Sequence, residues 1–370
     1  MRVFLSSGEA SGEMIAVALA QGLRAFEPDA RFEGIGSDRM RSAGIHVLDD
    51  TRGWASLGPV EALAKIPPLL AVMLRNAARL LRDPADLIVL VDFGAFNLRL
   101  ALTLRRLGYR RPILYFFPPG AWLDRAKQAR AVARSTTALS AFTHQRDFYR
   151  SLGLPIAYFG HPLTSLVDPR PSRPVPRPDG GTLALLPGSR RGELERHLGP
   201  LLASAERLRD ARPQLRVVAS AADADARRTL ARALGTTALE GVEIVDGARP
   251  ALDVADVALV ASGTAVLEAA LREVPTVALY IIRASQVPIA KRVWSGRFIT
   301  LPNILLQREV VPELLQEQAT PEALAAAAAA LLHDPRRQLA AFVELRSVLG
   351  PRDALERCAA FATALARSAA

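Results

Sequence analysis

Short runs of apolar residues alternate along this chain with stretches in which apolar positions recur every three or four residues. The runs have the length of strands that are buried on both faces of a parallel sheet, and the stretches between them have the period of an amphipathic helix. In the first half of the chain we expect strands at residues 3–7, 31–36, 87–91, 112–117, 137–142 and 156–159. In the second half we expect them at residues 183–186, 215–219, 242–245, 257–260 and 276–280. The pattern predicts an α/β fold with parallel sheets.

Two segments about half a chain apart share one arrangement, a strand followed by a turn of small residues and then a helix. The first turn is residues 8–13 (GEASGE) and the second is residues 187–190 (PGSR). Such a turn lets backbone N–H groups approach an anion, and the helix dipole favours negative charge at the same place. We therefore predict two Rossmann-like domains that face a cleft, with the C-terminal helices returning to the N-terminal domain.

The expected domain boundaries follow from a change in composition. Residues 168–179 (DPRPSRPVPRPD) are rich in Pro and Arg and have no apolar periodicity, which is typical of a linker. We expect an N-terminal domain at residues 1–168, a linker at 169–180 and a C-terminal domain at 181–345. The last segment, residues 346–370, is expected to be a helix that packs back on the N-terminal domain.

The net charge of +10 comes almost entirely from arginine, because the only lysines are Lys65, Lys127 and Lys291. This skew is typical of GC-rich codon usage, and no RRM, KH or zinc-finger pattern accompanies it, so it does not indicate a nucleic-acid partner. A basic surface facing an anionic membrane or a phosphorylated substrate accounts for the charge at least as well. The single cysteine, Cys358, excludes internal disulfides and suits a reducing cytoplasm. The five histidines lack metal-ligand spacing, so no metal is expected.

Within the region at residues 60–82, a basic amphipathic helix is predicted after Pro67-Pro68, from Leu69 to Leu81. No apolar run reaches about 18 residues, so the helix is not expected to cross a membrane. Pro67-Pro68 is a plausible start signal, and Arg75, Arg79 and Arg82 lie on one side. The opposite side is apolar and contains Leu69, Leu70, Met73, Leu74, Ala77, Leu80 and Leu81. This pattern suits an ordinary surface helix that packs on its sheet, and it also suits a helix that contacts a membrane or an acyl chain.

Asp92 is the first candidate for chemistry because it directly follows the most apolar strand of the first half, residues 87–91. Ligands of open α/β sheets bind at the carboxyl ends of the strands, so a carboxylate there is well placed to act as a general base. A helix N-cap or turn Asp would occupy the same position. Both interpretations remain open from position alone.

A second candidate site follows the strand at residues 257–260. Ser262, Gly263 and Thr264 begin a helix whose first amides are free to bind a diphosphate, and Glu268 lies one turn later, where it could hold ribose hydroxyls. Arg190, after the second small-residue turn with Gly188 and Ser189, is a natural phosphate partner. The alternatives are a capped helix with an exposed Glu, and an ordinary surface cation.

Together these stretches resemble the lipid-A-disaccharide synthases, a family of membrane-associated glycosyltransferases with the GT-B fold. The likeness runs over nearly the whole chain, and the order and spacing of its motifs make it specific. The motifs are residues 8–13 (GEASGE), 57–63 (LGPVEAL), 91–97 (VDFGAFN), 159–162 (FGHP), 185–190 (LLPGSR), 261–268 (ASGTAVLE) and 301–303 (LPN).

The resemblance implies an inverting transfer that joins UDP-2,3-diacylglucosamine to 2,3-diacylglucosamine 1-phosphate through a β-1,6 link and releases UDP. It implies that Asp92 is the catalytic carboxylate, that Arg190 and Asn303 serve activity or nucleotide binding, and that Glu268 holds the ribose. It also implies a site on the inner face of the cytoplasmic membrane, a homodimer, and no cofactor. The expected donor-binding residues are Gly188, Ser189, Arg190, Ser262, Gly263, Thr264, Glu268 and Asn303. The expected acceptor-side residues are Gly8, Glu9, Ser11, Gly12, Glu13, Trp122 and Arg125. The expected membrane contacts are Leu69, Leu70, Met73, Leu74 and Leu80.

Three departures from the family pattern lie in the N-terminal, acceptor-side domain. Glu13 stands where the family has Asp, Ala95 replaces a second carboxylate, and the segment around Trp122 carries an insertion and lacks one Trp. The donor motifs are intact, so we expect the protein to use a UDP-sugar. A relative that acts on another lipid acceptor, an enzyme similar to UDP-N-acetylglucosamine 2-epimerases, and a non-catalytic nucleotide-sugar-binding protein remain as alternatives.

Overall fold

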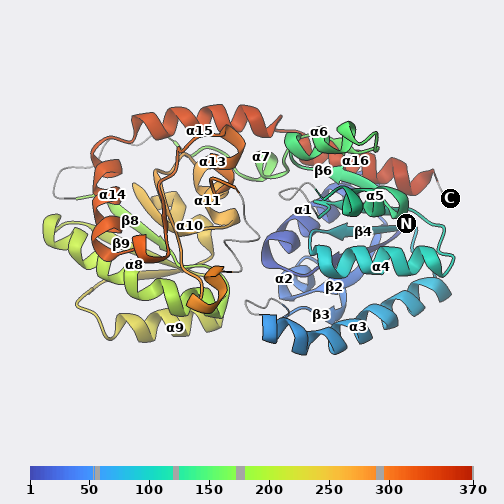
Figure 1. Cartoon of the computed structure of the whole chain (residues 1–370), viewed down its shortest axis with the longest axis horizontal. Helices are drawn as coiled ribbons and strands as arrows, with labels where there is room; N and C mark the ends of the chain where they lie inside the picture. The colour runs from blue at the N-terminus through green and yellow to red at the C-terminus, as the bar shows by residue number, and fades with distance from the viewer. Residues whose placement is uncertain (53, 55–58, 120–124, 172–179, 289–295, 369–370) are drawn as a thin grey trace. The chain divides into compact units, whose positions relative to one another are not determined.

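A computed structural model gives the structure of the chain, and it describes residues 1–52, 54, 59–119, 125–171, 180–288 and 296–368. The chain divides into two compact units. The N-terminal unit comprises Met1–Leu166 together with Leu349–Ala370, and the C-terminal unit comprises Val167–Val348 (Figure 1). Each unit has a parallel sheet of its own with helices on both faces.

The N-terminal unit is built on a seven-stranded sheet with the order β3-β2-β1-β4-β5-β6-β7, in which every pairing is parallel. The strands in the middle of this sheet are buried on both faces, which explains their continuous apolar runs. The strands are β1 (Arg2–Ser7), β2 (Arg31–Gly36), β3 (His46–Asp50), β4 (Leu87–Val91), β5 (Ile113–Phe116), β6 (Thr137–Ser140) and β7 (Ala157–Tyr158).

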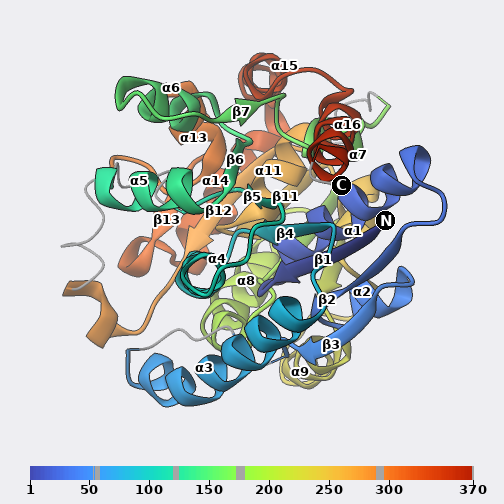
Figure 2. The same ribbon diagram turned by 90° about the vertical axis from the view of Figure 1, so that its right-hand side faces the viewer.

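The helices of the N-terminal unit cover the two faces of its sheet. One face packs against α3, α4 and α5 and the other against α1 and α16 (Figure 2). The helices are α1 (Ala10–Phe26), α2 (Asp38–Ser42), α3 (Pro59–Arg82), α4 (Gly94–Arg106), α5 (Ala126–Ser135), α6 (Thr143–Ser151), α7 (Leu163–Leu166) and α16 (Ala354–Arg367).

The C-terminal helix belongs to the N-terminal unit, as predicted. α16 runs beside α1, and Gly22 lets the two helices approach closely, because a Cβ at this position would lie 2.9 Å from the Cβ of Ala359. Arg367 donates to the carboxylate of Glu27 at 2.8 Å. Thr164 donates to the carbonyl of Pro351 at 2.7 Å, which anchors the segment before α16. The last helix therefore completes the cover over one face of the first sheet.

The C-terminal unit has a six-stranded sheet with the order β10-β9-β8-β11-β12-β13, again parallel throughout. Its strands are β8 (Thr182–Leu186), β9 (Arg216–Ala221), β10 (Glu243–Asp246), β11 (Val257–Ala261), β12 (Thr276–Tyr280) and β13 (Glu313–Leu315). Its helices are α8 (Arg191–Ala211), α9 (Ala224–Leu234), α10 (Ala248–Val254), α11 (Thr264–Leu271), α13 (Leu301–Leu306), α14 (Pro321–His333) and α15 (Arg336–Leu349), with short 3₁₀ turns at Ala284–Gln286 and Gln316–Gln318. The expected pair of Rossmann-like sheets is confirmed.

Helix α3 differs from its prediction in two ways. It begins at Pro59, so Pro67 and Pro68 lie inside the helix and do not start it. Its buried face includes Met73 and Leu80, which are 7% and 0% exposed and belong to the core of the N-terminal unit. Two of the five expected membrane contacts are therefore inaccessible, because they hold the helix on its sheet.

Among the side chains of α3 that the structure describes, the large apolar ones that are exposed are Ile66, Leu70 and Leu74, at 46%, 47% and 50%. They are spaced four residues apart and so form one row along the helix. Leu69, also expected at a membrane, is half-buried against the core. Among the described residues, no helix is long and apolar enough to cross a membrane.

Candidate active site

The turns after β1 and β4 meet at the carboxyl edge of the first sheet, because these two strands are neighbours. Gly8 is required in the first turn, since a Cβ on it would lie 2.4 Å from the ring of Phe93. Gly12 is also closely packed, because a Cβ there would lie 2.5 Å from the hydroxyl of Ser7. The opening motif thus brings the start of α1 against the turn that carries Asp92.

Asp92 adopts a left-handed backbone conformation at the end of β4. Its φ is 49° and that of Phe93 is 47°, which is uncommon for residues other than Gly and costs roughly 1–3 kcal/mol each. The Asp92 amide donates to the carbonyl of Phe116 at 3.0 Å. The Asp92 carbonyl accepts from Asn97 at 2.9 Å and from the hydroxyl of Tyr115 at 3.0 Å. The bend is held from three sides, and the side chain of Asp92 is exposed beyond it.

Asn97 is the main support of this bend. Its side chain is fully buried, and its Oδ1 accepts from the hydroxyl of Ser6 at 2.7 Å. Its Nδ2 donates to the carbonyls of Ser6, Val91 and Asp92 at 3.3, 3.2 and 2.9 Å. One amide therefore ties the ends of β1 and β4 together. The sequence placed Asn97 in a family motif without assigning it a role, because the pairing of β1 with β4 is visible only in the fold.

Aromatic rings line the same turn. Trp54 lies 5.9 Å from Phe93 and 5.3 Å from Phe96 between ring centroids, and Phe93 lies 5.8 Å from Phe96. These separations are typical of packed aromatic pairs. Burial, and then the nearby Asp92 carboxylate, raise the pKa of Tyr115 well above its ordinary value, so its hydroxyl remains protonated as a donor to the Asp92 carbonyl.

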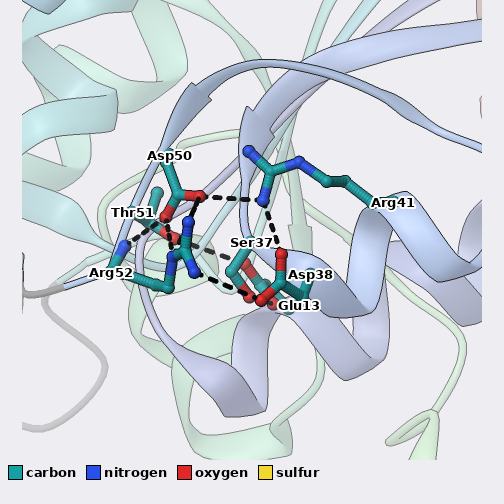
Figure 3. A network of polar contacts seen from close by, with 7 residues as sticks. All are labelled: Glu13, Ser37, Asp38, Arg41, Asp50, Thr51 and Arg52. Atoms are coloured by element: carbon teal, nitrogen blue, oxygen red, sulfur yellow. Dashed lines mark hydrogen bonds and ion pairs between the residues drawn. The ribbon is translucent and has the colours of Figure 1, made fainter.

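Glu13 lies in a buried network of hydroxyl groups, shown in Figure 3. Ser37, directly after β2, donates to Oε2 at 2.6 Å, and Thr51, directly after β3, donates to Oε1 at 3.3 Å. Glu13 is only 2% exposed, and this burial raises its pKa above the ordinary value of 4.5 even though both hydrogen bonds act in the opposite direction. The carboxylate thus links α1 to the ends of two further strands.

Two ion-paired arginines surround this network. Arg41 donates to Asp38 at 2.7 Å and to Asp50 at 2.8 Å, and Arg52 donates to Asp50 at 3.1 Å (Figure 3). The pairs are exposed to solvent, which screens them, so they contribute little to stability. Their effect is to fix the turns after β2 and β3, from which Ser37 and Thr51 reach Glu13.

Of the other expected acceptor-side residues, some lie at the N-termini of α1 and α5, and one lies outside the described residues. Glu9 is the N-cap residue of α1 and Ser11 lies in its first turn, both partly exposed. Arg125 is the exposed N-cap residue of α5. Trp122 lies outside the described residues, as does the side chain of Ala95. Contact of these residues with an acceptor remains a prediction.

In the C-terminal unit, the turn after β8 is shaped by a buried carboxylate. Gly188 has a φ of 107°, and a Cβ on it would lie 2.7 Å from Oε2 of Glu193. Glu193 is 6% exposed and accepts from the guanidinium of Arg190 at 3.0 Å and from its amide at 3.4 Å. This carboxylate therefore fixes Arg190 at the N-terminus of α8, while Ser189 is exposed at the tip of the turn. Glu193 has the three-residue spacing of a capping box, but the residue before it in that pattern is Arg190, so the Ser or Thr by which the pattern is recognised in a sequence is missing.

The neighbouring turn after β11 leads into the N-terminus of α11. Ser262 donates through its amide to the carbonyl of Leu279 at 2.9 Å, which fixes the turn to β12. Gly263 is exposed, and a Cβ on it would meet no described atom within 4 Å. The N-cap residue is Gly263, which has no side chain to cap the helix, and its carbonyl accepts from the amide of Val266 at 3.2 Å. Glu268 is partly exposed one turn later.

Asn303 is fully buried and makes four hydrogen bonds within the protein. Its Oδ1 accepts from the amides of Val310 and Val311 at 2.7 and 2.8 Å. Its Nδ2 donates to the carbonyl of Val311 at 2.7 Å and to Glu313 at 2.8 Å. This uses the full capacity of an amide side chain. Asn303 thus organises the segment before β13, and its direct contact with a donor remains a prediction.

Glu313 is the acceptor that completes this arrangement. Its carboxylate accepts from the amides of Ile299 and Thr300 at 2.9 Å each and from the Thr300 hydroxyl at 2.7 Å. It therefore caps the N-terminus of α13 from a distant strand. Among the described residues, no group of three or more His, Cys, Asp or Glu side chains has an arrangement that would hold a metal ion.

The sequence matches one family of known proteins over nearly its whole length. A sequence model of the lipid-A-disaccharide synthetase family matches residues 3–359. The chain is 37% identical over 381 residues to the lipid-A-disaccharide synthase of Azotobacter vinelandii, which covers 100% of this chain and 99% of that protein. It is 35% identical over 357 residues to the enzyme of Pseudomonas aeruginosa (strain LESB58), with 94% of each chain covered.

Comparison with solved structures gives the fold. A UDP-GlcNAc 2-epimerase from Neisseria meningitidis bound to UDP-GlcNAc has a TM-score of 0.66 at 10% identity, with 98% of this chain and 99% of that chain covered. The spinosyn rhamnosyltransferase SpnG has a TM-score of 0.57 at 15% identity, with 96% and 99% covered. At these identities the likeness concerns the fold alone, which is that of GT-B proteins.

Because the pKa of Glu13 is raised, the contribution of this residue to stability should change with pH. The carboxyl group binds its proton more tightly in the folded state, so its favourable contribution is complete below about pH 4.5 and is lost as pH rises through the folded-state pKa. We therefore expect Glu13→Gln to become more stable relative to the wild type as pH rises above 4.5. Urea unfolding of both proteins from pH 4 to pH 8 measures this difference. Glu356→Gln, which removes an exposed carboxylate on α16, provides the baseline. A difference that did not change with pH would contradict the raised pKa.

Proposed function

Because the chain belongs to the lipid-A-disaccharide synthetase family, a family of glycosyltransferases in lipid A biosynthesis, we propose that it joins UDP-2,3-diacylglucosamine to 2,3-diacylglucosamine 1-phosphate. The new link is β-1,6, the configuration at the donor C1 is inverted, and the products are lipid A disaccharide 1-phosphate and UDP. A homodimer and a place on the inner face of the cytoplasmic membrane are part of the same proposal.

In the proposed reaction Asp92 is the general base. Its carboxylate takes the proton of the acceptor 6-hydroxyl, the oxygen attacks C1 of the donor sugar, and the bond to the diphosphate breaks with its electron pair leaving on UDP. The observation that supports this role is the strained left-handed bend at Asp92, which Asn97 and Tyr115 hold in place. Strain that the surrounding structure maintains in this way is typical of functional sites.

The donor is proposed to bind at the carboxyl edge of the second sheet. Its diphosphate would accept hydrogen bonds from the hydroxyl of Ser262, from the amides of Gly263 and Thr264 at the start of α11, and from Arg190, with Gly188 and Ser189 shaping the adjacent turn. Arg190 is oriented by Glu193 at 3.0 Å, so little side-chain freedom is lost when an anion binds. Glu268 is proposed to hold the ribose hydroxyls. These donors stabilise the charge that develops on the departing diphosphate.

The three acceptor-side departures leave one alternative, a UDP-sugar transferase of the same family type that acts on a different lipid acceptor. Ala95 is the residue that favours it, because it stands where the resemblance implies a second carboxylate in an acceptor-side motif. A 2-epimerase activity has no support beyond the shared fold.

Activity is tested with both substrates present and with each omitted. We expect UDP release and a tetra-acyl disaccharide phosphate, identified by mass spectrometry, only when UDP-2,3-diacylglucosamine and 2,3-diacylglucosamine 1-phosphate are both supplied. UDP release that needs a different lipid acceptor would favour the alternative. UDP-sugar epimerisation without any acceptor would contradict the proposal.

Asp92→Asn should lower kcat by about 100-fold or more, the usual scale for loss of a general base, while UDP affinity stays unchanged. The amide keeps the size of the side chain and removes only its ability to accept a proton. Turnover with saturating substrates and UDP titration by calorimetry measure the two effects. Asp29→Asn, which alters an exposed carboxylate of the same unit, is the matched control. Wild-type turnover in Asp92→Asn would exclude Asp92 as the base.

The membrane contact is proposed for the exposed row Ile66, Leu70 and Leu74 of α3, supported by their exposure and by the arginines at positions 75, 79 and 82 of the same helix. Replacing all three with Ser should weaken binding to phosphatidylglycerol vesicles by at least about tenfold and leave the melting temperature nearly unchanged, since little buried surface is lost. Vesicle co-sedimentation measures the binding. Leu107→Ser, which removes a 59% exposed side chain from the same unit, is the control. Equal binding by the triple variant and the wild type would contradict the proposal.

A further inference from the structure

His197 is a fully buried histidine on α8 whose ring joins two loops of the C-terminal unit. Its Nδ1 lies 2.9 Å from the carbonyl oxygen of Pro187, and its Nε2 accepts from the amide of Ile281 at 3.0 Å. An amide only donates, so Nε2 carries no proton, and Nδ1 must therefore carry the proton that it donates to Pro187. Both ring nitrogens are used, and the ring is neutral.

The two loops follow the strands on either side of β11, which leads into the N-terminus of α11. Pro187 directly follows β8 and begins the turn that leads to Arg190, while Ile281 directly follows β12. In the sheet, β11 lies between β8 and β12, and the carboxyl end of β11 leads into Ser262 and Gly263. A single imidazole thus connects the loops that flank the proposed diphosphate site.

The neighbouring residue on α8 holds the same loop. Arg196 donates through Nε to the carbonyl of Ile281 at 2.7 Å, so both backbone polar groups of Ile281 are bound by consecutive side chains of one helix. The ring of His197 also lies 5.8 Å from the ring of Tyr280, the last residue of β12. The end of β12 is therefore fixed to α8, and His197 extends this connection to the turn after β8.

We propose that His197 is a positioning residue that sets the Pro187-Gly188-Ser189 turn for the diphosphate of the UDP-sugar. The inference rests on the proposed function, because it assigns a role at the proposed donor site. The histidine acts through the backbone of Pro187 and does not itself touch the donor. Burial lowers its pKa, which keeps the ring in the neutral form that both hydrogen bonds require.

Three variants separate positioning from bulk stability. Leu at position 197 fills the space and removes both hydrogen bonds. Gln carries a donor and an acceptor far enough along its side chain to restore both. Asn carries the same groups on a shorter side chain that reaches Pro187 and not Ile281. His333→Leu, which removes an exposed histidine from the same unit, is the control.

We expect His197→Leu to raise the Kd for UDP and the KM for the UDP-sugar by about tenfold, the scale of one well-made hydrogen bond, with the acceptor KM changed by less than about twofold. His197→Gln should recover most of the UDP affinity, and His197→Asn should recover less. Calorimetry with UDP, steady-state kinetics for each substrate and melting temperatures give these values. If His197→Leu does not fold, the comparison of Gln with Asn carries the test.

The outcomes distinguish this inference from the function on which it rests. A wild-type protein that does not bind UDP would overturn both. Wild-type UDP binding that His197→Leu leaves unchanged would overturn the positioning role alone, as would equal increases in the KM for donor and acceptor. If Leu does not fold and Gln and Asn bind UDP equally well, the bridge between the two loops is irrelevant to the donor site.

Discussion

Burial of both sheet faces is the constraint on which the rest of this structure depends. The central strands β4 and β11 have every residue buried, since helices cover each sheet from both sides. Polar groups cannot enter such layers without hydrogen-bond partners, so chemistry is confined to the strand ends. Asp92 follows β4 and Ser262 follows β11, which is the same topological position in two separate sheets. The candidate base and the candidate anion site therefore arise from one architectural rule applied twice.

A few buried polar side chains hold the turns at these edges. Asn97 ties the ends of β1 and β4, Glu193 fixes the turn after β8, and Glu313 caps α13. Each makes several hydrogen bonds while buried or largely buried, so its removal would leave partners unpaired at a cost of about 1–3 kcal/mol per group. Such side chains give the turns one conformation each, and a binding site built on backbone amides depends on that.

The strands that are completely buried, and the residues that directly follow them, could be predicted from the sequence. β1, β4, β8 and β11 were identified because strands buried on both faces read as continuous apolar runs. β3 and β13 were missed because they lie at sheet edges, are only partly buried and carry charged residues, as in His46–Asp50. The start of α3 was misplaced because two prolines that suit a first turn lie within a longer helix.

Site residues could be predicted from the sequence where their position depends on a single strand, but not where it depends on the order of the strands in the sheet. Asp92 and Ser262 follow apolar strands directly, so their place at an edge could be predicted from the sequence. Asn97 and His197 act on residues of other strands, and their partners are set by strand order, which no local pattern records. For Glu13, the expectation drawn from the sequence differs from what its contacts indicate. Its difference from the family's Asp suggested a changed acceptor site, yet its carboxylate is buried against Ser37 and Thr51, on the ends of β2 and β3. The longer side chain is accounted for by these two hydroxyls, so this departure argues for repacking beneath the edge more than for a different acceptor.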